Sequence, residues 1–158
     1  MTIVRTHEIP APERALSSLA VVDYADHFTL ATEVKATAEQ WARAMFGDTP
    51  SAGEILIWRV ILGLRLRRGR SPDTVAGWRI GARGDDWIRL EAQSWFLSAN
   101  LVVHAPVGRV SLWTFLRYGG PVGRYAWPPL SAVHRGLVPG VLRTAASSIQ
   151  RRADDAQV

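Results

Sequence analysis

The sequence predicts one α+β domain in which an antiparallel sheet curls around a long C-terminal helix and leaves a pocket for a small apolar molecule between them. Strand-like segments follow one another along residues 75–118 with no helix between them. After Gly120, apolar residues recur at helical spacing. The earlier helix signals are short, so the elements are grouped as in α+β proteins and do not alternate as in α/β proteins.

The composition is that of an ordinary globular chain. Its 158 residues fit one domain with a sizeable core, and apolar residues make up 47% and charged residues 21%. The absence of cysteine excludes disulfides and thiolate chemistry. Residues 1–14 lack the pattern of a signal peptide, and the longest apolar run, residues 55–66, is interrupted by arginine and too short to span a membrane. We therefore expect a cytoplasmic location and no membrane partner.

The basic balance of the chain comes almost entirely from arginine. The net charge is +5, and Lys35 is the only lysine. Residues 65–70 hold an arginine cluster, which is typical of a solvated helix end where cations meet the negative end of the helix dipole. A phosphate-binding patch is the alternative interpretation. No nucleic-acid-binding motif accompanies the cluster, so no nucleic acid partner is expected.

The N-terminal third begins with residues 1–20, whose two prolines and lack of a clear period predict an extended arm. Residues 21–34 are rich in β-branched and aromatic side chains and predict a first strand, with an irregularity near Asp26. The single domain would then span residues 21–150. Residues 151–158 would form a frayed tail.

Two capping boxes predict two short helices after this strand, because each pairs a Ser or Thr with a Glu or Gln three residues later. The boxes are Thr37 with Gln40 and Ser51 with Glu54. The helices should span residues 38–46 and 52–64, with a turn at residues 48–50 between them.

Four strand candidates follow a polar loop. They are Val75–Ala82, Trp87–Ser94, Trp95–His104 and Arg109–Tyr118. Turn residues at 84–85 and 106–108 fit antiparallel hairpins. No turn residue marks the boundary near Ser94, so one long, bent strand over residues 87–104 is the alternative.

The last third changes to a helical period. Its apolar positions are Leu130, Val133, Leu137, Val138, Val141, Leu142 and Ala145. The pair Pro139-Gly140 predicts a kink or a break, because proline removes a backbone donor and clashes with the preceding turn. The glycine-rich run at residues 119–123 is interpreted as a flexible gate or hairpin that leads into this helix.

Several segments are similar to one superfamily. They are Asp23-Tyr24-Ala25-Asp26, Trp41-Ala42-Arg43, Gly123-Arg124-Tyr125-Ala126-Trp127 and Val133-His134-Arg135. With the order of the elements, they resemble the helix-grip fold of START and Bet v 1-like proteins, the SRPBCC superfamily, and within it an uncharacterised bacterial branch. The wider superfamily includes lipid carriers, plant-hormone binders, and polyketide cyclases and aromatases. The resemblance, over about residues 20–150, therefore implies a ligand pocket without choosing between carrier and enzyme.

His134 is the strongest candidate for chemistry. It lies four residues from both Leu130 and Val138, on the apolar face of the predicted last helix. A histidine that faces a pocket can take or give a proton near neutral pH, and Tyr118 or Glu91 would complete the acid–base set. The alternative is a neutral core histidine whose one hydrogen bond fixes the helix on the sheet.

Charged residues near the first strand and the last helix form a further structural hypothesis. Arg135 could pair with a carboxylate at the rim of the pocket. Asp23 and Asp26 are the carboxylates that could anchor Arg124 or Arg135. This hypothesis concerns packing and assigns no chemistry to the two aspartates.

The faces of two strands decide which polar groups enter the pocket. One face of residues 95–104 is uniformly apolar and should meet the helix or the pocket, which turns Ser98 and Asn100 outward. A slip of one residue would turn both of them inward. Arg89 and Glu91 share one face of their strand, most simply as an outward ion pair.

The sequence contains seven tryptophans, many for its length. Flat aromatic walls suit a planar or polycyclic ligand. The side chains expected to line such a cavity are Trp41, Trp78, Trp95, Trp113, Tyr118, Trp127 and His134. The alternative is that the tryptophans fill the core.

The favoured function is binding of a small apolar or aromatic metabolite. The alternative is a cofactor-free enzyme of the cyclase or aromatase kind that uses the same cavity with His134 as acid or base. A nucleic-acid or protein partner for the arginine cluster ranks below both. The sequence has no metal-ligand spacing and no nucleotide loop, so neither a metal nor a cofactor is expected. A homodimer is left open.

Overall fold

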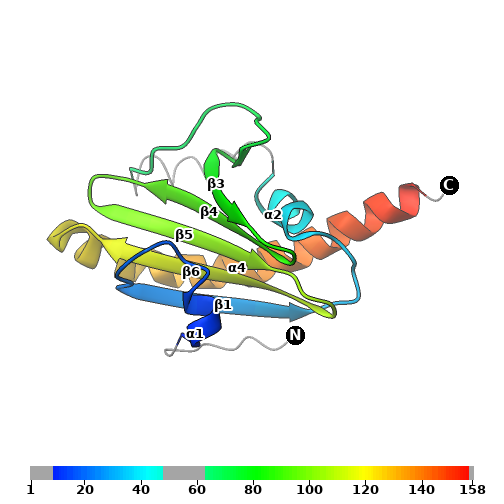
Figure 1. Cartoon of the computed structure of the whole chain (residues 1–158), viewed down its shortest axis with the longest axis horizontal. Helices are drawn as coiled ribbons and strands as arrows, with labels where there is room; N and C mark the ends of the chain where they lie inside the picture. The colour runs from blue at the N-terminus through cyan, green and yellow to red at the C-terminus, as the bar shows by residue number, and fades with distance from the viewer. Residues whose placement is uncertain (1–8, 48–62, 157–158) are drawn as a thin grey trace.

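The structure, a computed structural model, describes residues 9–47 and 63–156. A six-stranded antiparallel sheet lies against a long C-terminal helix, which crosses one face of the sheet (Figure 1). The elements in chain order are α1 (Ala11–Arg14), β1 (Tyr24–Ala31), α2 (Ala38–Phe46), β2 (Thr74–Val75), β3 (Trp78–Arg83), β4 (Trp87–Gln93), β5 (Leu97–His104), β6 (Arg109–Tyr118) and α4 (Pro121–Asp155). This is the helix-grip architecture that the sequence predicts.

The strand order is β1-β6-β5-β4-β3-β2. Consecutive strands from β2 to β6 pair as hairpins. The last strand, β6, also pairs with the first strand, β1, so that Tyr24 faces Leu116 and Ala31 faces Arg109. The β5–β6 turn uses Gly108 at φ 85°, a conformation that glycine adopts without strain. The first and the sixth strand therefore lie side by side and bring residues far apart in sequence onto one surface.

The prediction of a single strand at Val75–Ala82 is wrong in one respect, because a hairpin turn divides these residues between two strands, β2 and β3. The chain turns at Ala76 and Gly77, which both have positive φ, and this separates β2 from β3. Periodicity does not reveal such a turn, because Ala76 is an unusual residue in that conformation. The β4–β5 boundary is the predicted one, with the Ser94 amide donating to the Leu97 carbonyl at 2.7 Å. The alternative of one long strand is wrong.

Helix α2 confirms the first capping box. The Thr37 hydroxyl accepts from the Gln40 amide at 3.2 Å, and the Gln40 side chain accepts from the Thr37 amide at 2.8 Å. The helix ends at Gly47, as glycine at this position favours. The turn at residues 48–50 and most of the second predicted helix, residues 51–62, lie outside the described residues; residues 63 and 64 are not helical.

Helix α4 runs without a break from Pro121 to Asp155, so of the kink or break expected at Pro139 the break does not occur. Buried residues on both sides of this proline, Val138 and Leu142, pack in the core and stabilise the helix there. The expected gate at residues 119–123 is instead a bend followed by the first turn of α4, where proline is well placed. The helix also continues into the expected tail.

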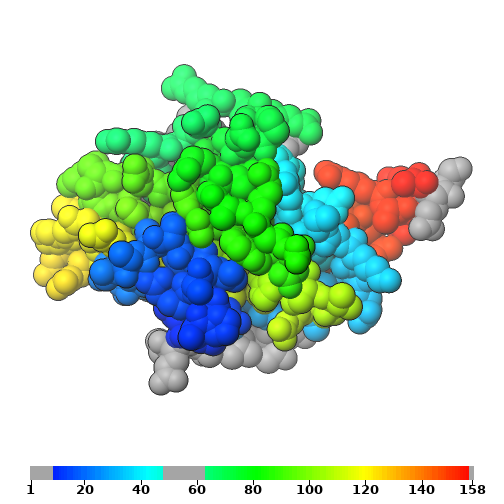
Figure 2. Space-filling view, in the orientation of Figure 1, coloured from blue at the N-terminus to red at the C-terminus, as the bar shows by residue number. Residues whose placement is uncertain are grey.

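Other elements pack on both faces of the sheet. The helix-facing side packs on α2 and α4, and Leu97, Leu101 and Val103 are buried there, in the register that the sequence favours. The outer side buries a second cluster, Val102, Trp113 and Phe115, under residues of the N-terminal segment (Figure 2). The described part of the expected extended arm therefore contains α1 and packs on the sheet.

Candidate functional site: a cavity between the sheet and the last helix

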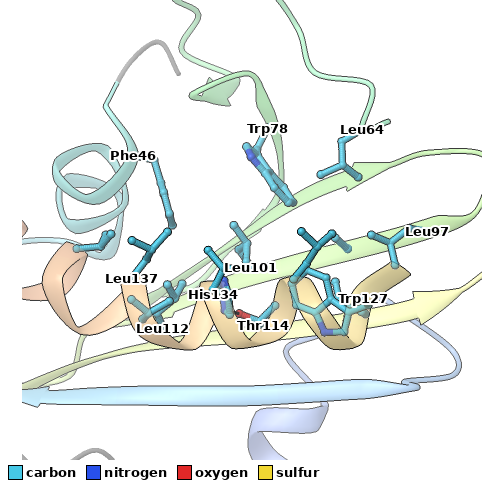
Figure 3. Close-up of a pocket in the computed structure, with 16 residues that line it drawn as sticks. Phe46, Leu64, Trp78, Leu97, Leu101, Leu112, Thr114, Trp127, His134 and Leu137 are labelled. Atoms are coloured by element: carbon cyan, nitrogen blue, oxygen red, sulfur yellow. Dashed lines mark hydrogen bonds between the residues drawn. The ribbon is translucent and has the colours of Figure 1, made fainter. Parts of the chain in front are cut away.

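A cavity of about 270 Å³ lies between the sheet and α4 (Figure 3). Strands β5 and β6 form its floor, and α4 forms the opposite wall. Phe46 at the end of α2, Leu64 and Trp78 close one side. The other described lining residues are Leu97, Ala99, Leu101, Leu112, Thr114, Leu116, Trp127, Leu130, Val133, His134, Leu137, Val138 and Val141.

The cavity wall is mostly apolar, and the polar side-chain atoms of the described lining residues belong to Thr114, His134 and the indole rings of Trp78 and Trp127. The alternation of β6 explains the position of Thr114, because even-numbered residues of this strand face the helix. Val133 and Leu137 are 50% and 54% exposed, so the cavity reaches the surface along α4. Such a wall suits an apolar molecule that meets a polar group at one place.

His134 projects from α4 toward β6 and β1. Its Nε2 atom lies 3.0 Å from the Thr114 hydroxyl and 3.4 Å from Oδ1 of Asp26. Asp26 is directly opposite Thr114 in the β1–β6 register, so the antiparallel pairing sets both acceptors beside the same ring nitrogen. The Trp127 ring lies 5.7 Å from the imidazole between ring centroids and packs along the same helix face.

Asp26 is a buried carboxylate, with 10% of its side chain exposed. Burial alone would raise its pKa, but the neighbouring His134 ring and the hydroxyls of Tyr24 and Thr114 outweigh that cost and hold the pKa below the ordinary 3.8. Asp26 is therefore anionic at neutral pH. Its Oδ1 atom makes no close hydrogen bond with the described residues.

Tyr24 and Arg135 complete the polar network behind His134. The Tyr24 hydroxyl donates to Oδ2 of Asp26 at 2.6 Å. Arg135 donates to Ser131 at 2.9 Å and to the Tyr24 oxygen at 3.4 Å, so it reaches Asp26 only through Tyr24. Burial, and then the Asp26 carboxylate, raise the pKa of Tyr24 to about 12. Tyr24 is thus a neutral donor to the carboxylate.

The structure does not bring Glu91 and Tyr118 to His134. Glu91 lies on the outer face of the sheet in ion pairs with Arg79 and Arg89, as the outward interpretation predicts. Tyr118 lies beside Asp23 near the start of α4 and lines a separate depression. Neither residue lines the cavity, so the acid–base set expected from the sequence is not assembled.

Two of the expected tryptophans line the cavity, Trp78 and Trp127. Trp41 is buried in the core beside it, and Trp95 is 72% exposed outside it. Trp113 stacks on His27 on the outer face, at 4.1 Å between ring centroids. Trp113 points outward because it is an odd-numbered residue of β6, whereas the helix-facing side of this strand holds residues 110, 112, 114 and 116.

Sequence reasoning missed the role of Thr114 and gave Asp26 only a structural one. Both residues lie on predicted strands, but only the β1–β6 pairing brings them together, and that pairing joins segments about ninety residues apart. A polar residue on an otherwise apolar face of residues 110–116 was the available signal for Thr114.

Residues 9–47 and 63–156 contain no group of three or more histidine, aspartate or glutamate side chains placed to hold a metal ion. Within the same ranges, no helix has both the length and the apolar character needed to cross a bilayer.

Comparisons with known proteins give only distant likenesses. No protein-family model matches the chain, and neither does any curated protein. Similar solved structures include the Mll3558 protein from Rhizobium loti, at 11% identity and a TM-score of 0.38 over 81% of this chain and 97% of that chain. Another is Ara h 8.0201, at 11% identity and a TM-score of 0.37 over 81% of this chain and 99% of that chain. The fold assignment therefore rests on the sheet order and the C-terminal helix.

Proposed function

We propose that the protein binds a small apolar or aromatic molecule in the cavity between the sheet and α4. One observation carries this proposal: a cavity of about 270 Å³ that reaches the surface and has a mostly apolar wall, with polar side-chain atoms only on Thr114, His134 and two indole rings among the described lining residues. A ligand that buries about 200 Å² of apolar surface gains about 5 kcal/mol before the costs of association. The two tryptophans in the wall supply flat surfaces for an aromatic ring.

Titration with 2-methoxynaphthalene, followed by its fluorescence, tests the proposal. Leu101→Trp places a large side chain in the cavity, because Leu101 is 5% exposed and lies in the floor. Val107→Trp is the matched control, since Val107 is fully exposed in the β5–β6 turn. We expect Leu101→Trp to weaken binding by at least about tenfold and the control to bind like wild type. Equal affinity of the two variants for 2-methoxynaphthalene would indicate that the probe binds outside the cavity.

Acid–base catalysis at His134 is a second candidate, of the cofactor-free cyclase or aromatase kind. The observation that favours it is the buried, anionic Asp26 beside a histidine of the cavity wall, an arrangement that can orient an imidazole for proton transfer. Loss of turnover in His134→Gln with retained binding of the substrate would support it. Turnover that survives this change would exclude His134 as the acid or base.

Four further expectations from the sequence stay predictions. They are membership of the bacterial branch of the SRPBCC superfamily, a cytoplasmic location, the absence of a nucleic acid partner, and a homodimer if the chain self-associates. Size-exclusion chromatography with light scattering measures the last directly.

A further inference from the structure

We propose that the cavity prefers apolar molecules that carry one hydroxyl group, and that this hydroxyl donates a hydrogen bond to Nδ1 of His134. The proposal rests on the proposed function, because it assigns the ligand class of the same cavity. Asp26 and Thr114 act as positioning residues, since they contact the opposite nitrogen of the ring.

The first step is the occupation of Nε2. Both polar neighbours of the imidazole, the Thr114 oxygen at 3.0 Å and the Asp26 oxygen at 3.4 Å, lie beside this atom. Figure 3 shows His134 and Thr114 joined by this hydrogen bond beneath the cavity. Nε2 is therefore turned toward the protein network.

The second step is the position of the ring proton. If the Thr114 hydroxyl donated to an unprotonated Nε2, the nitrogen lone pair would face Oδ1 of Asp26, a buried carboxylate oxygen that makes no close hydrogen bond with the described residues. Leaving such an oxygen without a donor is costly. With the proton on Nε2, the ring donates toward Thr114 and Asp26, and the threonine proton is free to turn to the carboxylate. In the neutral ring, the network therefore favours Nε2–H and leaves Nδ1 as an acceptor.

The third step is the access to Nδ1. Nδ1 has no hydrogen bond from the described residues. It is not one of the fully buried polar atoms that lack a partner, so the packing around the ring leaves it accessible. The ring itself forms part of the cavity wall. An unpaired acceptor at the edge of an apolar wall is best satisfied by a ligand that brings a single donor.

The surrounding wall narrows the ligand class. Leu130, Val133 and Leu137 flank the histidine on α4 and offer no polar partner to a ligand. A carboxylate ligand is disfavoured, because the anionic Asp26 lies directly behind the ring. A phenol-like molecule meets both demands, with one donor for Nδ1 and an apolar body for the rest of the cavity.

The test compares two probes of nearly equal shape, 2-naphthol and 2-methoxynaphthalene. Both have an oxygen that can accept, but only 2-naphthol can donate. We expect wild type to bind 2-naphthol about fivefold more tightly, the value of one net hydrogen bond. His134→Phe should remove this preference and leave the affinity for 2-methoxynaphthalene within about twofold of wild type, with His134→Leu as a second variant.

Nitrogen-15 NMR of the imidazole tests the positioning residues separately. At a pH where the ring is neutral, wild type should show its proton on Nε2. Asp26→Asn should raise the share of the Nδ1–H form and reduce the preference for 2-naphthol, because the Asp26 carboxylate is the acceptor that favours the proton on Nε2. Asp23→Asn is the matched control, because Asp23 accepts from the Tyr118 amide and does not contact His134.

The outcomes separate the two proposals. Failure of both probes to bind would overturn the proposed function. Equal binding of both probes by wild type, or a preference that survives His134→Phe, would overturn only the selection of a hydroxyl. A wild-type ring protonated on Nδ1 would overturn the role given to Asp26 and Thr114.

Discussion

At the scale of single residues, Asp26 has the most consequences. It is a buried carboxylate on the edge strand β1, it receives a hydrogen bond from Tyr24, and it lies beside His134. These neighbours favour its ionised form more than burial disfavours it, which is why its pKa is lowered. Asp26 thus links the stability of the contact between β1 and α4 to the position of the ring proton on His134.

A dependence of stability on acid follows from this lowered pKa. Asp26 contributes stability in full above its ordinary pKa of 3.8, and the contribution is lost as the pH falls through the lower value of the folded state. We expect Asp26→Asn to lower the free energy of unfolding by about 2 kcal/mol at neutral pH. The gap should close as the pH falls below 3.8, as urea unfolding at several pH values would measure. A difference in unfolding free energy between wild type and Asp26→Asn that stays constant with pH would contradict this account.

The candidate site shows what residue patterns can predict. The helical period after Gly120 places His134 on the buried face, and the structure confirms that it lines the cavity. Glu91 and Trp113 each lie on the outer face of the sheet. A shift of one residue in strand register would have turned either side chain toward the cavity face. Asp26 and Thr114 become neighbours only through pairing of the first and sixth strands, which no local pattern encodes.

At the scale of elements, α4 combines poor helix formers with a continuous helix. It contains Pro128, Pro129 and Pro139 and still runs from Pro121 to Asp155. Local propensity predicts a kink or a break at Pro139, whereas burial of Val138, Leu142 and Ala145 keeps the helix continuous through tertiary contacts. The capped helix α2 was predictable because its signal is entirely local.

Two glycines of α4 provide a matched test of its packing. An added Cβ at Gly123 would lie 2.6 Å from the Phe96 carbonyl oxygen, whereas at Gly136 it would meet open space. We expect Gly123→Ala to destabilise the fold by about 1–3 kcal/mol through overpacking. Gly136→Ala should stabilise it by about 1 kcal/mol, since alanine is the better helix former. Denaturant midpoints measure both, and equal shifts would contradict the close approach of α4 to Phe96.

At the scale of the whole molecule, the sheet separates two packed faces with different roles. The helix-facing side holds the cavity, whereas part of the outer side is covered by the N-terminal segment. Asn100 fixes that segment, because its side-chain oxygen accepts from the Ser17 hydroxyl at 2.8 Å and the Ser18 amide at 2.8 Å. The sequence predicted that Asn100 points away from the helix, but not that the N-terminal segment would bury it.

The separation of the faces is testable at Asn100. Asn100→Ala leaves the buried Ser17 hydroxyl and the partly buried Ser18 amide without their acceptor, so we expect a loss of about 2 kcal/mol in stability. Hydrogen exchange should rise in the N-terminal segment. Binding of 2-methoxynaphthalene should stay at the wild-type affinity, because Asn100 does not line the cavity. A variant that keeps its stability and loses binding would contradict the division into two faces.

The central claim, that the space between the sheet and α4 receives an apolar molecule, is tested most directly by intermolecular NOEs. The measurement uses protein with labelled methyl groups and bound 2-methoxynaphthalene. The account predicts NOEs from the probe to the methyl groups of Leu101, Leu112 and Val138, which share the cavity. NOEs confined to Val102 and Leu19 on the outer face, or no NOEs at saturating probe, would contradict it.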